Sequence, residues 1–338
     1  MNCAELEKTF LSDINRVAET FINAFGLSFS HDEVHLADPL VRWLDFSYRY
    51  IEPKQRRFIA SRDLESKEAR LPVIIQNSLS MFRSKVETGG DINPFQSRGL
   101  YANDVSSGKR QRRTDLLLAD WSIHHFHLTD VPVQPGTTFS ERSDFLLFGV
   151  VFSDAVLAID VREHPSGVGF ADSELLEIAI RNWPESFQQY SLSGALALAQ
   201  SYSNEERHQL RKAGVTALQE IAGHVYMPPG LGVTTASTPT SLSLKTNEIR
   251  RGVKSVAKFF QKEDNKLSII CRNSTGKDPD FHIIITPKGL AVCEPNIDQA
   301  QLIEPLGIAW AGTVAPAWAI ARLSDSAGQP NHNISTVD

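Results

Sequence analysis

Residues 121–128 read Trp-Ser-Ile-His-His-Phe-His-Leu, and this stretch decides the fold. Successive side chains of a strand point to opposite faces, so His125 and His127 are expected to share one face. Two further runs rich in β-branched and aromatic residues follow at 144–152 and 155–161, and Ser-Asp between them is typical of a tight hairpin. The stretch therefore predicts an antiparallel sheet that carries a pair of imidazoles on one face.

Helical patterns precede this sheet. Asn2 and Glu5 form a possible capping box ahead of apolar residues at spacings of three and four. A second helix is expected to begin at Pro39, and a third to run from about Lys67 to Gly89. Between the third helix and the histidines, residues 116–118 are expected to form a short strand.

The second half begins with another capping box. Ser203 and Glu206 precede a helical pattern that is expected to continue through Ile221 with a break at Gly214. A helix is also expected around residues 249–260. Three strands are expected to end the second half, at 266–271, 281–286 and 290–293.

The predicted fold class is α+β, with an N-terminal helical layer and an antiparallel sheet followed by a second α/β unit that ends in a three-stranded meander. The expected parts are the histidine-bearing domain 1–190, the α/β unit 191–304, an apolar strap 305–323 and a disordered tail 324–338.

Composition limits the possible functions. A net charge of -6 over 338 residues excludes a surface that binds nucleic acid or acidic lipid everywhere, so such a site must be a local patch. The three cysteines lie far apart, which suits a reducing compartment and supplies no Cys-based metal motif. With acidic residues in the first turn and no run of 18 apolar residues, the sequence predicts a cytoplasmic protein without a membrane segment.

The histidines suggest general acid/base catalysis. A general acid and a general base need groups that titrate near neutrality and are held close together, which a strand pair of histidines provides. We therefore take His125 and His127 as candidate acid/base residues, with His164 at the end of the next hairpin assisting them. The same spacing also suits metal ligation by His125 and His127, with His164 or Asp115 as a further ligand, or half-buried histidines with a purely structural role.

Basic residues lie next to the histidines. The segment from Arg98 to Arg113 has five cations and one acid and leads directly into the sheet, which is what a phosphodiester substrate would require. Arg112, Arg113 and Arg162 are therefore candidate phosphate clamps, and RNA is the candidate partner. A solvated charged loop is the alternative interpretation.

Two other segments leave their roles open. The Gly/Thr-rich loop 228–241 lacks the spacing of a P-loop or a dinucleotide site, so no cofactor is expected, and it is either a connecting loop or an anion cradle. Residues 305–321 contain no charged side chain. Trp310 and Trp318 in this segment indicate either a strap packed on the body or a surface for a protein partner.

Residues 142–164, with the preceding histidine strand, resemble the sheet of RelE/ParE-type bacterial toxins. The resemblance covers residues 115–165 and implies a fold like that of mRNA interferases, in which Arg142, Arg162 and His164 face RNA. The chain departs from that family because no tyrosine closely follows His164, where Phe170 stands instead, and because these toxins are much shorter.

The leading hypothesis is a nucleic-acid-directed protein that acts as a metal-independent endoribonuclease of toxin or phage-defence type. The alternatives are a non-catalytic interaction or scaffold subunit of a larger complex, and a small metal-dependent hydrolase that uses the His-x-His strand.

Overall fold

The computed structural model describes residues 2–29, 38–107, 114–195, 197–198, 200–327 and 335–336. The fold class is α+β, as the sequence predicts. The chain forms two compact units that are each discontinuous in sequence: the first comprises Met1–Tyr48, Asp104–Gly108 and Leu242–Asp338, and the second comprises Arg49–Asn103 and Lys109–Ser241. The domain boundary that the sequence analysis expects near residue 190 therefore lies inside the second unit and coincides with no boundary between the two units.

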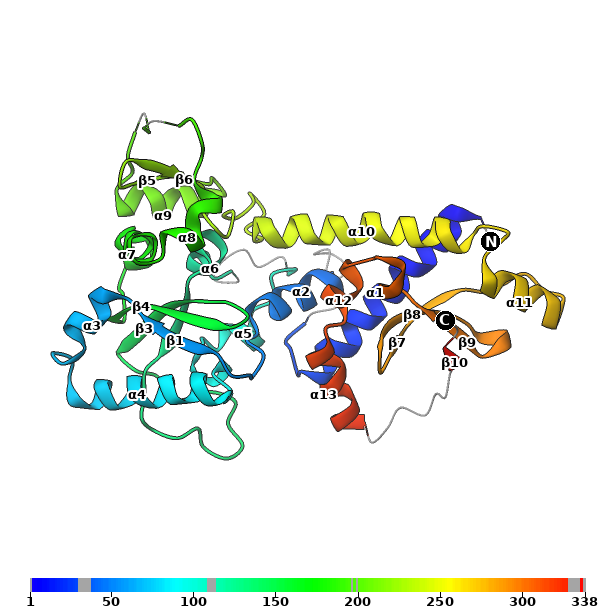
Figure 1. Cartoon of the computed structure of the whole chain (residues 1–338), viewed down its shortest axis with the longest axis horizontal. Helices are drawn as coiled ribbons and strands as arrows, with labels where there is room; N and C mark the ends of the chain where they lie inside the picture. The colour runs from blue at the N-terminus through cyan, green and yellow to red at the C-terminus, as the bar shows by residue number, and fades with distance from the viewer. Residues whose placement is uncertain are drawn as a thin grey trace. The chain divides into compact units, whose positions relative to one another are not determined.

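The second unit is built on a four-stranded sheet in the order β1-β4-β3-β2 (Figure 1). Strands β2 (His124–His127), β3 (Phe145–Val151) and β4 (Ala155–Glu163) are antiparallel neighbours, which confirms the predicted hairpin. Strand β1 (Arg57–Ala60), which the sequence analysis does not predict, adds to β4 in parallel.

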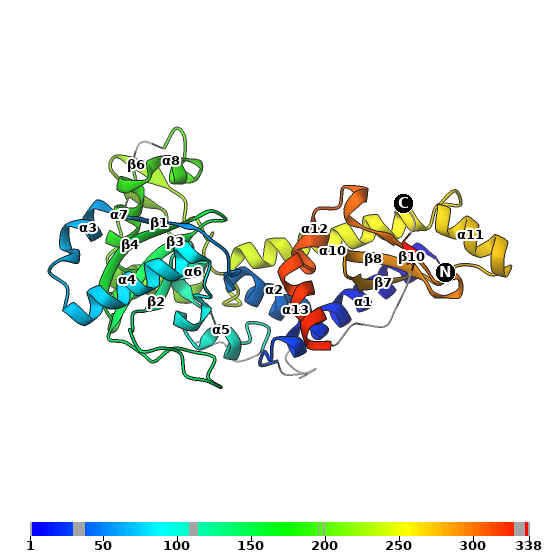
Figure 2. The ribbon, with the colours of Figure 1, turned by 60° about the horizontal axis from the view of Figure 1, so that its bottom comes forward.

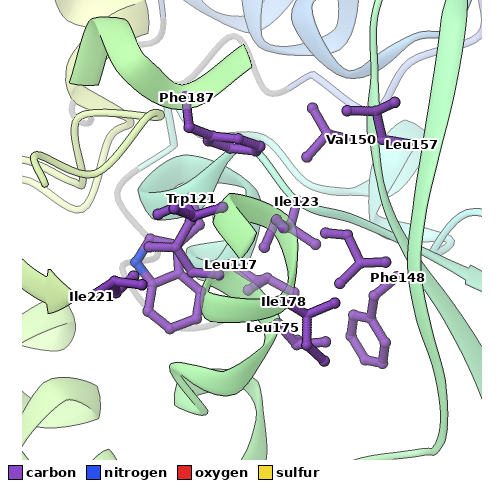
Figure 3. Close-up of a cluster of buried hydrophobic side chains, with 14 of the residues drawn as sticks. Leu117, Trp121, Ile123, Phe148, Val150, Leu157, Leu175, Ile178, Phe187 and Ile221 are labelled. Carbon is purple, nitrogen blue, oxygen red and sulfur yellow. The ribbon is translucent and has the colours of Figure 1, made fainter. Parts of the chain in front are cut away.

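Each face of this sheet carries its own apolar cluster. On one face, side chains of α6 (Leu116–Trp121), α7 (Glu174–Asn182) and α8 (Pro184–Phe187) surround Ile123 and Phe148 of the sheet region (Figure 3). On the other face, Phe82 of α4 (Val73–Thr88) packs on Phe126 and its neighbours. The strands are therefore buried on both sides, and alternate residues of β2 enter different environments.

Two expectations for the part of this unit that precedes β2 are wrong. Residues 116–118 belong to the helix α6 and not to a strand, because the carboxylate of Asp115 accepts hydrogen bonds from the amides of Leu117 and Leu118 and caps the helix. The helix expected from Lys67 is two helices, α3 (Arg62–Glu68) and α4, with Pro72 at the N-cap of α4. Its expected end is confirmed, since Gly89 ends α4 in the left-handed conformation.

The rest of the second unit consists of short elements. These are α5 (Gly99–Ala102), α9 (Asn204–Ala213), β5 (Gln219–Ile221) and β6 (His224–Tyr226). The capping box of α9 is confirmed, but Gly214 ends this helix in the left-handed conformation, so the expected continuation to Ile221 is wrong.

The Gly/Thr-rich loop packs against the backbone of α6. The amides of Gly230 and Gly232 donate hydrogen bonds to the carbonyls of Asp120 and Ala119. A Cβ atom at Gly230 would lie 2.4 Å from the Ala119 carbonyl oxygen, so only glycine fits there. These two amides are already engaged, so neither is available to an anion, and this part of the loop connects α6 to the segments around it.

The first unit has a sheet in the order β10-β9-β8-β7. Strands β7 (His282–Thr286), β8 (Gly289–Glu294) and β9 (Gln299–Leu302) form an antiparallel meander, which confirms the predicted motif. The expected strand at 266–271 is wrong, because these residues begin α11 (Lys266–Thr275), and the Asn265 side chain caps it. The third strand is β9 instead.

Helices make up the rest of the first unit. They are α1 (Cys3–Ala24), α2 (Pro39–Arg49), α10 (Thr240–Phe260), α12 (Trp310–Val314) and α13 (Ala317–Ala327), and the capping box at the start of α1 is confirmed. Two of them contact the sheet, α1 on β7 and α12 on β8. Buried Asp13 of α1 accepts a hydrogen bond from the Ile283 amide of the edge strand β7, which fixes the helix on the sheet.

The apolar strap packs within the first unit. Trp310 is buried, and the Trp318 ring lies 5.8 Å from the Trp43 ring and 5.6 Å from the Phe25 ring. Trp310 therefore belongs to the core and half-buried Trp318 packs on the aromatic rings beside it, so the expected docking surface for a protein partner is not supported.

The expected disorder after Ser324 is wrong for part of the tail. Helix α13 continues to Ala327, and β10 (Ser335–Thr336) pairs in parallel with β9. The other residues of the expected tail lie outside the described part of the chain. None of the helices in the described ranges is long and apolar enough to span a bilayer.

Candidate functional site

A β-bulge brings the site together. Phe148 of β3 lies opposite Asp160, but the next residue, Gly149, lies opposite Ala158, so Ile159 is an extra residue in β4. A bulge of this kind shifts the alternation of the strand by one residue. As a result, the part of β4 that follows the bulge presents Arg162 and then His164 to the same face as His127.

Three imidazoles gather on that face around Phe170. The His127 and His164 rings are stacked, with centroids 6.0 Å apart and an angle of 26° between their planes. The Phe170 ring lies 5.7 Å from His164 and 5.4 Å from His125. His124 lies on the opposite face, where it stacks on Phe126. The structure thus brings together His125, His127 and His164, as the sequence predicts. We call this group the histidine cluster.

Backbone carbonyls fix the tautomers of two of these rings. Nδ1 of His127 lies 3.4 Å from the Ser143 carbonyl oxygen, and Nδ1 of His164 lies 3.2 Å from that of Pro165. A carbonyl oxygen can only accept a hydrogen bond, so each Nδ1 must carry a proton and donate. In the neutral ring, Nε2 then holds the lone pair.

Burial keeps His127 uncharged. Burial, together with the nearby His125, His164 and Arg142, lowers the pKa of His127 to about 4, although the Ser143 carbonyl opposes this shift. At neutral pH the ring is therefore in the form that accepts a proton.

His125 is paired with a carboxylate. Its Nδ1 lies 3.5 Å from an oxygen of Asp115, the residue that caps α6. Burial raises the pKa of Asp115, but His125, Arg49 and the Leu118 amide outweigh burial, so the pKa is below its ordinary value and the carboxylate is ionised. The pKa of His125 is lowered, chiefly by burial, even though Asp115 opposes this. The sequence suggested Asp115 only as a possible metal ligand.

The expected arginines differ in their availability. Arg162 is bonded to three carboxylates, those of Asp160, Asp172 and Glu174, at 2.7 to 2.9 Å, so its charge is already compensated. The expectation that Arg162 clamps a phosphate is therefore not supported. Arg142 is exposed, and it lies close enough to His127 to affect the pKa of that ring. Arg112 and Arg113 lie outside the described residues.

Two buried arginines of α9 hold Phe170 in place. Arg211 donates to the Phe170 carbonyl at 2.8 Å, and Arg207 donates to the Ala171 carbonyl at 2.7 Å. Arg211 also bonds to Asp120 at 2.6 Å and lies over the Trp121 ring at 4.1 Å. The sequence analysis missed this pair, although an amphipathic helix with so few apolar residues needs other side chains to fill its buried face.

A metal centre is the alternative interpretation of the histidine cluster. In the ranges that the structure describes, no three side chains of His, Cys, Asp or Glu are grouped so that they could hold a metal ion. The alternative in which His125, His127 and His164 share a metal ion is therefore not supported.

Comparisons with protein-family models, with curated proteins and with solved structures found no match to this chain. The function of this chain must therefore be inferred from the geometry of the histidine cluster.

Proposed function

We propose that this protein is a cytoplasmic, metal-independent endoribonuclease of toxin or phage-defence type. The observation that carries the proposal is the contact between His127 and His164, whose tautomers leave Nε2 of each ring for proton transfer. Cleavage of RNA by its own 2′-hydroxyl needs a base, an acid and a cation, and the histidine cluster with Arg142 supplies these three groups.

The roles follow from burial. His127 is held neutral by its low pKa, so its Nε2 takes the proton from the 2′-hydroxyl as O2′ bonds to phosphorus. Exposed His164, in its imidazolium form, gives a proton to O5′ as the bond between phosphorus and O5′ breaks. Arg142 balances the charge that develops on the phosphoryl oxygens. The products are a 2′,3′-cyclic phosphate and a 5′-hydroxyl.

Substrate binding adjusts the base. A pKa of about 4 makes His127 a weak base in the free protein. An anion close to an imidazole favours its charged form, so a phosphodiester bound beside the ring raises this pKa toward the working pH. Asp115 orients His125 behind the reacting pair and is a positioning residue in this scheme.

The proposal predicts cleavage that survives a chelator. Purified full-length protein is incubated with a labelled RNA, with and without EDTA, from pH 4 to pH 8, and fragments are separated on a gel. We expect the same fragments in both series. We also expect kcat/KM, which reports the free protein, to persist below pH 6.5, the ordinary pKa of histidine, because the pKa of His127 in the free protein is about 4.

Folding must be followed at each pH. In the folded state the pKa of His124 and that of His127 lie near 4 and not at 6.5, so the unfolded chain binds more protons between these values. The folded state therefore loses stability as the pH falls through this range, and far-UV circular dichroism identifies the points at which the protein is still folded. The absence of fragments at every pH where the protein is folded would favour the scaffold interpretation, and loss of cleavage in EDTA would favour a metal-dependent hydrolase.

A further inference from the structure

Helix α10 of the first unit presents a row of cations that have no acidic partner. Arg251, Lys254 and Lys258 follow one another at spacings of three and four residues, so they share one face of the helix. All three are exposed, and no ion pair to any of them occurs within the described ranges. We call these three residues the basic stripe.

Other cations of the same helix are neutralised. Lys245 pairs with Glu248 at 3.0 Å, and Arg250 pairs with Asp38 at 2.5 Å. The unpaired charges are therefore confined to the basic stripe. Arg251 and Lys258 are seven residues apart, or about 10 Å along the helix axis, which suits a ligand with regularly repeated negative charges better than a single small anion.

Helix α10 lies next to α1 (Figures 1 and 2). A shallow groove lies beside the stripe. It has a volume of about 510 Å³ and is lined by Glu7, Leu244, Asn247, Arg250, Arg251 and Lys254. Polar and cationic groups thus dominate the lining, with Glu7 as the one acid among these six residues. The Asn247 amide adds a group that can donate to a phosphate oxygen.

The apolar face of α10 is already occupied. Phe260 packs edge to face on Phe10 of α1, and a Cβ atom at Gly252 would lie 1.9 Å from Nε1 of Trp310. A helix that binds a bilayer needs a free apolar face to insert among the lipids. Because that face is buried, α10 can bind a partner mainly through its charged side chains. A charged helix without a free apolar face favours a nucleic acid as the partner over a membrane.

We infer that the basic stripe binds the phosphate backbone of RNA, which makes the first unit a substrate-holding surface. The choice of RNA as the polyanion rests on the proposed ribonuclease function. The binding itself depends only on the residues of α10 and does not require the histidine cluster.

The test compares two triple variants in full-length protein that also carries His127→Ala, so that bound RNA is not cut. The first is Arg251→Gln, Lys254→Gln, Lys258→Gln, which keeps good helix formers in α10. The matched control is Lys212→Gln, Lys277→Gln, Lys288→Gln, which removes the same charge from three other exposed positions. Fluorescence anisotropy with a labelled single-stranded RNA is measured over a range of salt concentrations.

The stripe variant is expected to bind at least tenfold more weakly at low salt, because each lost phosphate contact contributes about 0.7 to the slope of log K against log salt, so the slope falls by about 2. The control is expected to keep its slope. Unchanged affinity and slope in the stripe variant would overturn the inference, as would stripe-dependent binding to phosphatidylserine vesicles or to polyglutamate in place of RNA.

The same data separate the two proposals. If RNA binding depends on the stripe but the wild-type protein yields no fragments, the ribonuclease proposal is wrong and the inference about the basic stripe stands. If a stripe variant binds RNA as tightly as the wild type and still cleaves it, the inference about the basic stripe is wrong and the ribonuclease proposal stands.

Discussion

Replacing His127 with alanine is expected to lower the rate of RNA cleavage by about 10²- to 10⁴-fold, the usual contribution of a general base. The loss follows from the geometry, because no other described ring both stacks on His164 and has Nδ1 tied to the Ser143 carbonyl. The rate is measured under single-turnover conditions with a labelled RNA, and far-UV circular dichroism checks that the variant is folded.

His124→Ala is the matched control for this variant. It removes the same ring from the same strand, but His124 stacks on Phe126 at the other face of the sheet. We expect the cleavage rate of folded His124→Ala to stay within a few-fold of the wild type. Equal losses in both variants would show that the effect comes from disturbing the strand, and a wild-type rate in His127→Ala would remove the base from the mechanism.

Replacing Arg211 with alanine is expected to reduce the free energy of unfolding by about 3–5 kcal/mol, because it leaves the carboxylate of Asp120 buried without its partner. Both side chains are only 4 % exposed, and Arg211 also holds the Phe170 carbonyl and covers the Trp121 ring. Urea unfolding followed by circular dichroism measures the loss. Cleavage should fall as well, since the Phe170 ring lies against two histidines of the cluster.

A double variant separates the ion pair from the packing. In Arg211→Met with Asp120→Leu, no charge is left buried, and most of the stability should return. Cleavage should remain impaired, because the donor to the Phe170 carbonyl is still missing. Lys212→Ala, at the exposed neighbouring position, controls for a change in α9 itself. A stability of Arg211→Ala within about 1 kcal/mol of the wild type, the scale of an exposed ion pair, would contradict this account.

The sequence predicts the histidine strand correctly because alternation is a local property of β-structure. His125 and His127 share one face, and the capping boxes at Asn2 and Ser203 begin helices as expected. These signals depend on neighbours within a few residues, so they are visible in the sequence alone.

Short apolar runs are where sequence reasoning fails. Residues 116–118 and 266–271 are rich enough in leucine and isoleucine to suggest strands, yet both form helices. In each case the residue before the run, Asp115 or Asn265, caps the helix with its side chain. The sequence analysis gave the apolar run more weight than this capping residue. Strand β9 was missed for the opposite reason, because Gln-Ala-Gln-Leu has little β-propensity and is held by its pairing with β8.

The sequence analysis expects His164 near His127, but strand alternation alone does not explain their meeting. Regular alternation along β4 would place His164 on the face opposite His127, and only the extra residue Ile159 reverses this. Gly149 opposite the bulge is the one local sign, since a Cβ atom there would lie 2.9 Å from the Leu157 carbonyl oxygen. The compensation of Arg162 by three carboxylates depends on Asp172 and on Glu174 of α7, so it is likewise a tertiary property.

The end groups of the RNA fragments test the acid/base pair most directly. Mass spectrometry of fragments made by the wild-type protein in EDTA is expected to show 2′,3′-cyclic phosphates and 5′-hydroxyls, because the 2′-hydroxyl is the nucleophile when His127 and His164 move the protons. Fragments that carry 5′-phosphates and 3′-hydroxyls would mean that water attacks the phosphorus, and they would contradict the mechanism proposed for this site.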